Sequence, residues 1–252
     1  MKLYVEAERL YTEGKYIDSI ELFLQAFKQK EEPNSCLNYL GCCYLALGNY
    51  LLAKDYFEKV INIAPDWERP IFNLGRVYLK LNDLKNALEC FQKAEVINSD
   101  NEDVYFYLGL YYQNEKNYPQ ALLHYKKSLS INFDQSEVHL NIGLIFMHLD
   151  DPDSALHEFN IALGLDHNST EAMWNKSLAL LKLKRIEQAI ESLEEAYKLN
   201  PNDVEIVYEL VKINFISKKY EQAKIWAAKV LAIDPNFESI NIVMQKIISK
   251  IG

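Results

Sequence analysis

Hydrophobic and polar positions follow a helical period along this chain, and the same pattern returns every 34 residues. Within each unit, apolar side chains recur at spacings of three and four, which places them on one stripe of an α-helix. The chain therefore reads as a row of tandem helical hairpins. One column of small residues marks each step of 34 without insertion or deletion: Ser19, Ala53, Ala87, Ala121, Ala155, Ala189 and Ala223.

Three further columns keep this register. Four positions after the small residue stands a large apolar one in the first six units: Phe23, Phe57, Phe91, Tyr125, Phe159 and Leu193. Three positions later a small or β-branched residue follows: Ala26, Val60, Ala94, Ser128, Ala162, Ala196 and Val230. A glycine inside a helix costs about 1 kcal/mol relative to alanine, so repeated glycines indicate helices packed closely. Four such glycines stand in a column earlier in each unit, which reads Ala7, Gly41, Gly75, Gly109, Gly143, Ser177 and Val211.

Polar residues predict where the helices begin. The pairs Gly14-Lys15 and Gly48-Asn49 mark turns inside the units, and so does the acidic run from Asp150 to Asp153, which lacks the ligand spacing of a calcium loop. An Asp or Asn before each new unit is expected to cap the next helix, with a Glu three residues later completing three capping boxes. The expected caps are Asp66, Asp100, Asp134, Asn168, Asn202 and Asn236, and the glutamates are Glu137, Glu171 and Glu205.

These columns resemble the tetratricopeptide repeat (TPR) family over nearly the whole chain. The resemblance implies an all-α fold, a right-handed α-solenoid of helix-turn-helix repeats. In this register the repeats fill residues 1–237, and the seventh has drifted from the pattern, as terminal repeats do. The amphipathic stretch 238–252 predicts a C-terminal capping helix that ends the solenoid, with an apolar stripe of Ile240, Val243, Met244, Ile247, Ile248 and Ile251. The predicted repeats are 1–33, 34–67, 68–101, 102–135, 136–169, 170–203 and 204–237.

Composition narrows the class of partner. A net charge of -9 and a pI of about 5.2 argue against nucleic acid and against an anionic membrane surface. The N-terminus lacks the apolar core of a signal peptide, and no stretch approaches 18 consecutive apolar residues, so we expect no membrane insertion. Four cysteines without metal-ligand spacing are typical of reduced thiols, and we expect a cytoplasmic protein.

No constellation predicts catalysis. The five histidines are scattered over different columns, and the chain has no HExxH motif, no glycine-rich phosphate loop and no GxSxG nucleophile elbow. The unbroken register also leaves no insertion in which an active site could be built. We therefore expect no enzymatic activity, no metal site and no cofactor.

The family resemblance implies a peptide-binding groove on the concave surface, lined by the first helix of each repeat. The inward-facing columns of this sequence supply the candidate groove residues. They are Asn38, Arg69, Phe72, Asn73, Arg76, Lys80, Phe106, Tyr107, Asn141, Trp174, Asn175 and Tyr208.

Two columns of this groove suggest how a peptide could be held. Asn73, Asn141 and Asn175 resemble the asparagine ladder of long TPR proteins, in which each amide both donates to and accepts from a peptide backbone. The alternative is that they are solvated polar residues. The aromatic column Phe72, Phe106, Trp174 and Tyr208 offers apolar surface to a partner, and core packing between neighbouring helices is the competing interpretation.

The groove also carries charge. Arg69, Asn73, Arg76 and Lys80 share one face of the third repeat with Asn38 opposite, and could receive a carboxylate. The alternative is that the arginines form local ion pairs with Asp103 or Glu68. The face lacks the residue pattern of the carboxylate clamp of chaperone-binding family members, so chaperone C-termini are disfavoured. Toward the C-terminal half the predicted groove turns acidic, with Glu137, Glu171, Glu205 and Glu209.

The leading functional hypothesis is a non-catalytic scaffold that binds an extended peptide or a partner helix in the groove. One alternative is a self-assembling structural module, in which the partner is another copy of the chain in a homo-oligomer. The other is a peptide-sensing regulatory subunit, which would need an effector domain that this sequence does not contain.

Overall fold

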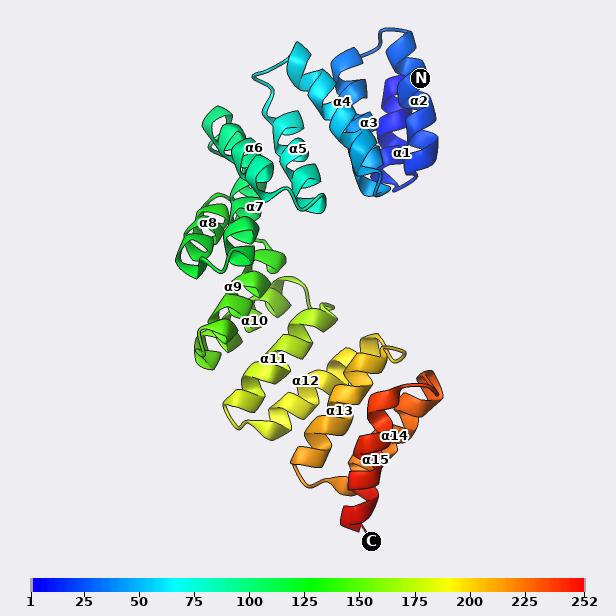
Figure 1. Ribbon diagram of the computed structural model, residues 1–252, viewed down its shortest axis with the longest axis vertical. Helices are drawn as coiled ribbons and strands as arrows, with labels where there is room; N and C mark the ends of the chain where they lie inside the picture. Colours follow the sequence, from blue (N-terminus) through cyan, green and yellow to red (C-terminus); the bar gives the residue numbers. More distant parts are fainter. Residues whose placement is uncertain (1, 252) are drawn as a thin grey trace. The chain divides into compact units, whose positions relative to one another are not determined.

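The computed structural model describes residues 2–251, apart from the side chain at position 251 (Figure 1). Within that range the chain forms 15 α-helices joined by short turns, and no β-strand. The contacts divide it into two compact units, Met1–Asn132 and Phe133–Gly252.

The N-terminal unit consists of four helical hairpins. Each helix packs against the next one in the sequence. The first helix of a hairpin also contacts the first helix of the following hairpin: α1 contacts α3, and α3 contacts α5. The first helices thus form one layer, which we call the first-helix layer. The helices are α1 (Leu3–Thr12), α2 (Tyr16–Lys28), α3 (Pro33–Ala46), α4 (Tyr50–Ile63), α5 (Glu68–Lys80), α6 (Leu84–Ile97), α7 (Glu102–Asn114) and α8 (Tyr118–Ile131).

The C-terminal unit consists of three hairpins followed by one more helix. Its first helices α9 and α11 are in contact across successive hairpins, and α15 packs against α14 and α13. The helices are α9 (Ser136–His148), α10 (Pro152–Leu165), α11 (Thr170–Lys182), α12 (Ile186–Leu199), α13 (Val204–Ile216), α14 (Tyr220–Ile233) and α15 (Glu238–Ile251).

The columns found in the sequence form the core of both units. Every member of the small-residue column from Ser19 to Ala223, and of the column from Ala26 to Val230, has no exposed surface. The large apolar column from Phe23 to Leu193 is at most 1% exposed. Ser19, the only polar member of the first column, donates its hydroxyl hydrogen to the carbonyl oxygen of Ala7 over 2.8 Å. The predicted packing stripes are confirmed.

The glycines of the first helices lie directly under the large rings of the second helices. A Cβ added to Gly41 would lie 2.6 Å from Cε1 of Phe57, and one added to Gly75 would lie 2.6 Å from Cε1 of Phe91. Gly109 faces Tyr125 and Gly143 faces Phe159 in the same way. Because no real side chain fits in such a gap, the predicted close approach of the two helices is confirmed.

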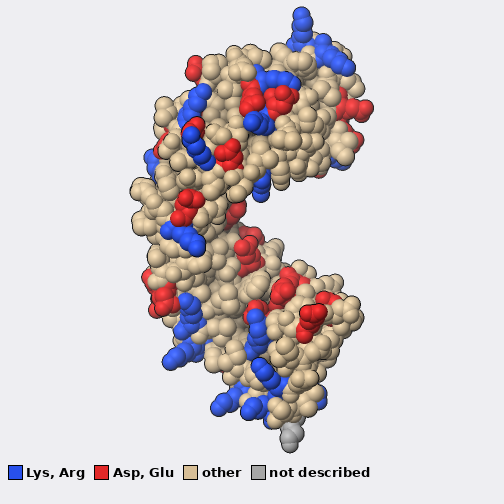
Figure 2. Space-filling view, in the orientation of Figure 1, with Lys and Arg blue, Asp and Glu red and all other residues tan. Residues whose placement is uncertain are grey.

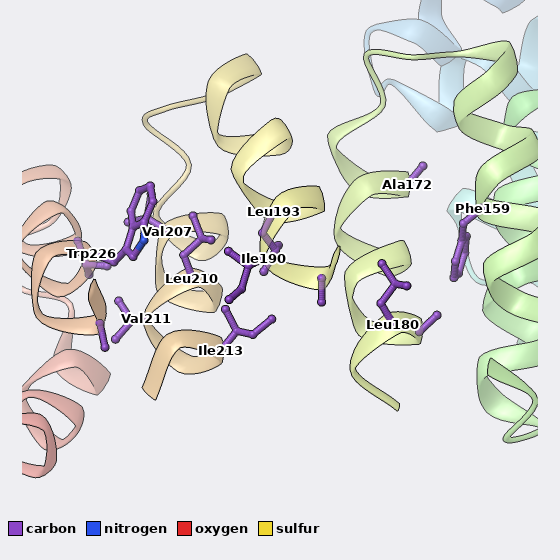
Figure 3. Packing of buried hydrophobic residues seen from close by; sticks show 14 of the residues in the cluster. Phe159, Ala172, Leu180, Ile190, Leu193, Val207, Leu210, Val211, Ile213 and Trp226 are labelled. Carbon is purple, nitrogen blue, oxygen red and sulfur yellow. The ribbon is translucent and has the colours of Figure 1, made fainter. Parts of the chain in front are cut away.

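In the C-terminal unit one buried cluster runs through successive hairpins (Figure 3). Leu193 of α12 and Val207 and Leu210 of α13 point into the space between these helices (Figure 3). Trp226 of α14 continues the cluster, and Ile240 and Ile247 of α15 complete it with no exposed surface. This cluster therefore links the hairpins of the unit to α15, and a smaller cluster of Met173, Ala196 and Ile206 lies beside it.

Each hairpin turns through a residue with a left-handed backbone. The N–H groups of this residue and of the next one donate to carbonyl oxygens at the end of the first helix. In one such turn the N–H of Lys184 donates to the carbonyl oxygen of Leu181 over 3.0 Å, and that of Arg185 to the carbonyl oxygen of Leu180 over 2.9 Å. This is the Schellman arrangement, in which glycine is the favoured left-handed residue. Here only Gly14 and Gly48 are glycines, and the other five turns use Asn82, Lys116, Asp150, Lys184 and Lys218, with φ between 58° and 61°.

The expected caps before the first helices are one residue out of place. The N-cap residues are Trp67, Asn101, Gln135, Ser169 and Asp203, each one position after the predicted one. A turn explains the shift, because the N–H of Trp67 bonds to the carbonyl oxygen of Ala64, which leaves Asp66 inside the turn. Glu137, Glu171 and Glu205 therefore stand at the second helical position and form no capping box. The prediction for the acidic run is confirmed, since Asp151 caps α10 through Ser154.

The stripe of α15 is narrower than predicted. Ile240 and Ile247 are fully buried and Val243 and Met244 partly so, but Ile248 is 56% exposed. The side chain of Ile251 lies outside the described residues. Because α15 packs on one hairpin only, a narrow contact line suffices, and the wider predicted stripe was wrong at Ile248.

Gly75→Ala is expected to lower the free energy of unfolding by about 1–3 kcal/mol, because its Cβ would overlap the Phe91 ring. Gly164→Ala is the matched control. Gly164 lies within α10 with nothing within 4 Å of an added Cβ, so this change should stabilise by up to about 1 kcal/mol. Urea unfolding of both variants measures the difference. Equal changes in the free energy of unfolding for the two variants would show that the packing of the Phe91 ring does not require a glycine at position 75.

Lys184→Gly is expected to raise the free energy of unfolding by about 1 kcal/mol, because it relieves the left-handed strain of a residue with a Cβ at φ 60°. Lys184→Ala removes the same charge and keeps the Cβ, so it should not stabilise. Thermal unfolding of the two variants side by side makes the comparison. An alanine variant as stable as the glycine variant would contradict the prediction.

Candidate functional site

A cavity of about 520 Å³ opens on the first-helix layer of the N-terminal unit. Residues of α1, α3, α5 and α7 line it, together with the turn between α6 and α7. Five predicted groove residues meet here: Asn38, Arg69, Phe72, Asn73 and Arg76. We call it the Asn38–Arg76 cavity. Tyr107 contacts Arg76 without lining the cavity, and the exposed Lys80, at the end of α5, does not line it either.

Arg76 is the best-connected side chain of this cavity. Its Nε donates to the Tyr107 hydroxyl oxygen over 3.0 Å, and its Nη1 donates to Oδ1 of Asn73 over 3.1 Å. Its guanidinium carbon also lies 5.3 Å from the centre of the Tyr107 ring and 5.8 Å from that of Phe72. These contacts hold the guanidinium in place before any ligand arrives.

Neither arginine of the cavity is neutralised by an ion pair. Among the residues that the structure describes, no carboxylate lies within 4.0 Å of Arg69 or Arg76, so the local pairing with Asp103 or Glu68 is not formed. Arg69 is exposed and Arg76 half-buried. Both charges are therefore available to a ligand.

Asn38 contributes an unused hydrogen-bond acceptor. The residue is 6% exposed, and its Oδ1 is buried without a hydrogen-bond partner in the described chain. Buried polar atoms are nearly always paired, so this one marks a place where a ligand donor or a water would fit. Asn73, by contrast, is already engaged: its Nδ2 donates to the sulfur of Cys42 over 3.5 Å and its Oδ1 accepts from Arg76.

Acidic groups border the same cavity from α5 and α7. Burial raises the pKa of the Glu68 carboxyl, and Asn101, which donates to Glu68 Oε1 over 2.5 Å, opposes that shift. Although Asp103 is exposed, desolvation and the neighbouring Glu102 charge raise the pKa of its carboxyl, against the influence of Arg76. The cavity thus offers both donors and acceptors to a ligand.

The predicted aromatic column divides into core and surface residues. Phe72 and Phe106 are 6% and 7% exposed, and both pack against the Tyr107 ring, at 5.3 Å between ring centres. The core interpretation therefore fits these two phenylalanines. Trp174 is half-buried, and so is Tyr208, which packs on Phe237 at 5.0 Å and carries the Lys212 ammonium group above its ring.

A second cavity, of about 400 Å³, lies on the first-helix layer of the C-terminal unit. Trp174 and Asn175 of α11 line it, with Leu144 of α9 and Ile206 of α13. We call it the Trp174 cavity. The Asn175 Nδ2 donates to the carbonyl oxygen of Glu171 over 3.0 Å. Asn141 is 9% exposed, makes the same bond to Glu137 and does not line this cavity.

The sequence did not single out the α6–α7 turn as part of a site. Asn98, Asp100 and Asn101 line the Asn38–Arg76 cavity, although Asp100 was expected only as a helix cap. The 34-residue register places this turn directly before α7 but does not show that it folds over α5. Cys42 also lines the cavity, and burial raises the pKa of its thiol to about 12, so the thiol stays protonated at neutral pH.

Charges of both signs are dispersed over the visible face of the molecule, with wide uncharged areas between them (Figure 2). Among the described residues, no three His, Cys, Asp or Glu side chains gather in a geometry that would hold a metal ion. None of the helices in residues 2–251 has the length and apolar character needed to cross a bilayer.

Protein-family models match four stretches of this chain. Models described as TPR repeat or tetratricopeptide repeat match residues 35–67, 75–116, 140–204 and 180–247. The chain belongs to the tetratricopeptide repeat family. Proteins of this TPR family are generally non-catalytic protein-interaction scaffolds. No curated protein matches the sequence itself.

Solved structures share the TPR fold at low sequence identity. PilF of Pseudomonas aeruginosa superposes with a TM-score of 0.75 at 19% identity, over 86% of this chain and 99% of that one. YrrB, described as a TPR protein with an unusual peptide-binding site, gives 0.62 at 21% identity, over 75% and 97%. A chain of the APC/C hetero-tetramer Cut9–Hcn1 gives 0.70 at 16% identity over 97% of this chain, which spans only 55% of that one.

Asn38→Leu is expected to keep or raise the free energy of unfolding, by up to about 1 kcal/mol, because it removes a buried acceptor that has no hydrogen-bond partner in residues 2–251. Asn214→Leu is the matched control. Asn214 is 2% exposed, and its Nδ2 donates to the carbonyl oxygen of Leu210 over 2.8 Å, so its loss should cost about 1 kcal/mol. Chemical denaturation compares the two. An equal loss for both would show that Asn38 is already satisfied without a ligand.

Proposed function

We propose that this TPR chain is a scaffold that binds an extended segment of a partner protein on its first-helix layer, with the Asn38–Arg76 cavity as the main contact. The interaction role that is general in the family supports this proposal. A peptide-binding site in the structurally similar YrrB supports it further.

The unpaired Oδ1 of Asn38 carries the proposal. It is a buried acceptor in a cavity whose two arginines form no ion pair with any described residue. A peptide group brings one N–H and one C=O, so it can donate to Asn38 and accept from Arg69 or Arg76 at the same time. An extended chain offers such pairs at every residue.

The acidic border favours neutral peptide groups over a free carboxylate. Glu68 and Asp103 line the cavity with Arg69 and Arg76, and they would repel a second negative charge. A peptide dipole complements both signs at once. We therefore assign the arginines to main-chain carbonyl groups rather than to an acidic side chain of the partner. In this assignment Asn73 acts indirectly, by holding Arg76.

Selection of random peptides on the immobilised full chain tests the proposal. Peptides enriched by the wild type should bind Arg69→Ala and Asn38→Leu about tenfold more weakly, because each variant removes a hydrogen bond made in a partly desolvated site. Calorimetry on resynthesised peptides gives the dissociation constants, and unfolding curves confirm that both variants are folded.

Lys85→Ala supplies the control for loss of one positive charge. Lys85 lies on the second helix α6 with its side chain 85% exposed, away from the cavity lining. It should bind the selected peptides like the wild type. Failure to enrich any peptide, or equal binding by the cavity variants and Lys85→Ala, would overturn the proposal.

A further inference from the structure

The Trp174 cavity differs in chemistry from the Asn38–Arg76 cavity. We infer that it receives the side chain of a lysine or arginine from a bound partner segment. This inference rests on the proposed function, since it takes the first helices of the scaffold to bind partner segments.

The charge of the lining selects a cation. Glu171 and Asp203 are its two charged side chains, and no basic residue lines it. Within the described part of the chain Glu171 makes no ion pair. Asp203 accepts from the N–H groups of Glu205 and Ile206 over 3.0 and 3.2 Å, which fixes its carboxylate at the start of α13. Two acidic groups therefore face the same space without a counter-charge in the lining.

The remaining lining suits the stem of a long basic side chain. Leu144, Leu178 and Ile206 supply apolar surface, and Trp174 adds an indole ring. Lysine and arginine bury their methylene groups on such surfaces while the charged head stays near water. Tryptophan is also the aromatic side chain that attracts a cation most strongly. A shorter acidic or amide side chain would meet repulsion or leave the apolar surface bare.

Two polar groups of α11 can hold the main chain beside that side chain. The indole Nε1 of Trp174 is buried and has no hydrogen-bond partner among the described residues. Asn175 donates to the carbonyl oxygen of Glu171, which leaves its own Oδ1 as an acceptor. A donor and an acceptor on neighbouring residues match the C=O and N–H of a peptide.

Glu209 does not take part, although the sequence placed it in the acidic half of the groove. Its carboxylate pairs with Lys212, and it does not line the cavity. Glu137 and Glu205 are exposed and also lie outside the lining. The acidic character that matters is therefore confined to Glu171 and Asp203.

A titration of the ¹⁵N-labelled full chain with N-acetyl-arginine methylamide tests the inference. The chain has three tryptophans, Trp67, Trp174 and Trp226, so three indole N–H signals are expected, and Trp174→Phe assigns the one that matters. That signal should shift saturably, and the other two should not. N-acetyl-norleucine methylamide, which has the apolar stem without the charge, and N-acetyl-glutamate methylamide should bind several times more weakly.

Glu171→Gln should weaken binding of the arginine probe about threefold to fivefold, because an exposed ion pair in water changes a dissociation constant by little more than this factor. Added salt should weaken it similarly. Glu221→Gln removes an exposed carboxylate of α14 outside the cavity and should change nothing. An unmoved Trp174 signal, equal shifts with the glutamate probe, or an unchanged Glu171→Gln variant would overturn the inference.

The probe is a single residue, so its result does not depend on the Asn38–Arg76 cavity. Arg69→Ala should give the same Trp174 response as the wild type. An unmoved Trp174 signal with the arginine probe, together with selected peptides whose binding needs Arg69, would overturn this inference alone. A saturable Trp174 response without any selected peptide would overturn the proposed function and leave the cation pocket standing.

Discussion

The contact between a large ring and a residue without a side chain organises each hairpin. The rings of Phe57, Phe91 and Phe159 lie where a Cβ on the facing glycine would be only 2.5–2.6 Å away. The two helices of a hairpin can therefore approach as closely as their backbones allow. The ring itself is fully buried, so the same contact supplies much of the apolar surface that the hairpin removes from water.

Size complementarity along the two columns preserves this arrangement where the glycine is missing. In the sixth hairpin Ser177 takes the place of the glycine, and Leu193, smaller than a phenylalanine, takes the place of the ring. In the last hairpin Val211 stands in the glycine column and Ala227 in the ring column, so the larger residue of the pair is on the first helix. Both members of that last pair are fully buried. In these pairs a larger residue on one helix faces a smaller one on the other, which keeps the packing dense even when the individual residues change.

The core is built from the second helices and from one face of the first helices, so the other face of the first helices can present different chemistry to solvent. In the N-terminal unit the first-helix layer has a cavity with arginines, carboxylates and an unpaired amide oxygen. In the C-terminal unit it has a cavity with an apolar lining and two carboxylates. Each also contains a buried polar atom with no hydrogen-bond partner among the described residues, in Asn38 and Trp174. Such atoms weaken the free protein slightly and strengthen a complex that satisfies them.

The sequence by itself determined the helices and the core. A register of 34 residues repeated seven times identifies which stripe of each hairpin helix faces its neighbour, because side chains three and four positions apart lie on one face of a helix. The three columns on the second helices, from Ser19, Phe23 and Ala26 onward, are at most 1% exposed over the residues predicted for them. Tertiary structure decided what period cannot show. Phe72 and Phe106 are buried because the Tyr107 ring packs against both, and Asn73 is engaged because Cys42 and Arg76 lie within reach.

Helix starts and the walls of the cavities also depended on tertiary structure. Before α5, α11 and α13 the turn closes a backbone hydrogen bond, from Trp67 to Ala64, from Ser169 to Asp166 and from Asp203 to Asn200, and the N-cap lies one residue later than predicted. No side-chain pattern records that bond. The α6–α7 turn lines the Asn38–Arg76 cavity, and Asn101 of this turn donates to Glu68, 33 residues earlier. Side chains in a repeat column share a direction, whereas their depth and partners depend on residues contributed by the neighbouring hairpin.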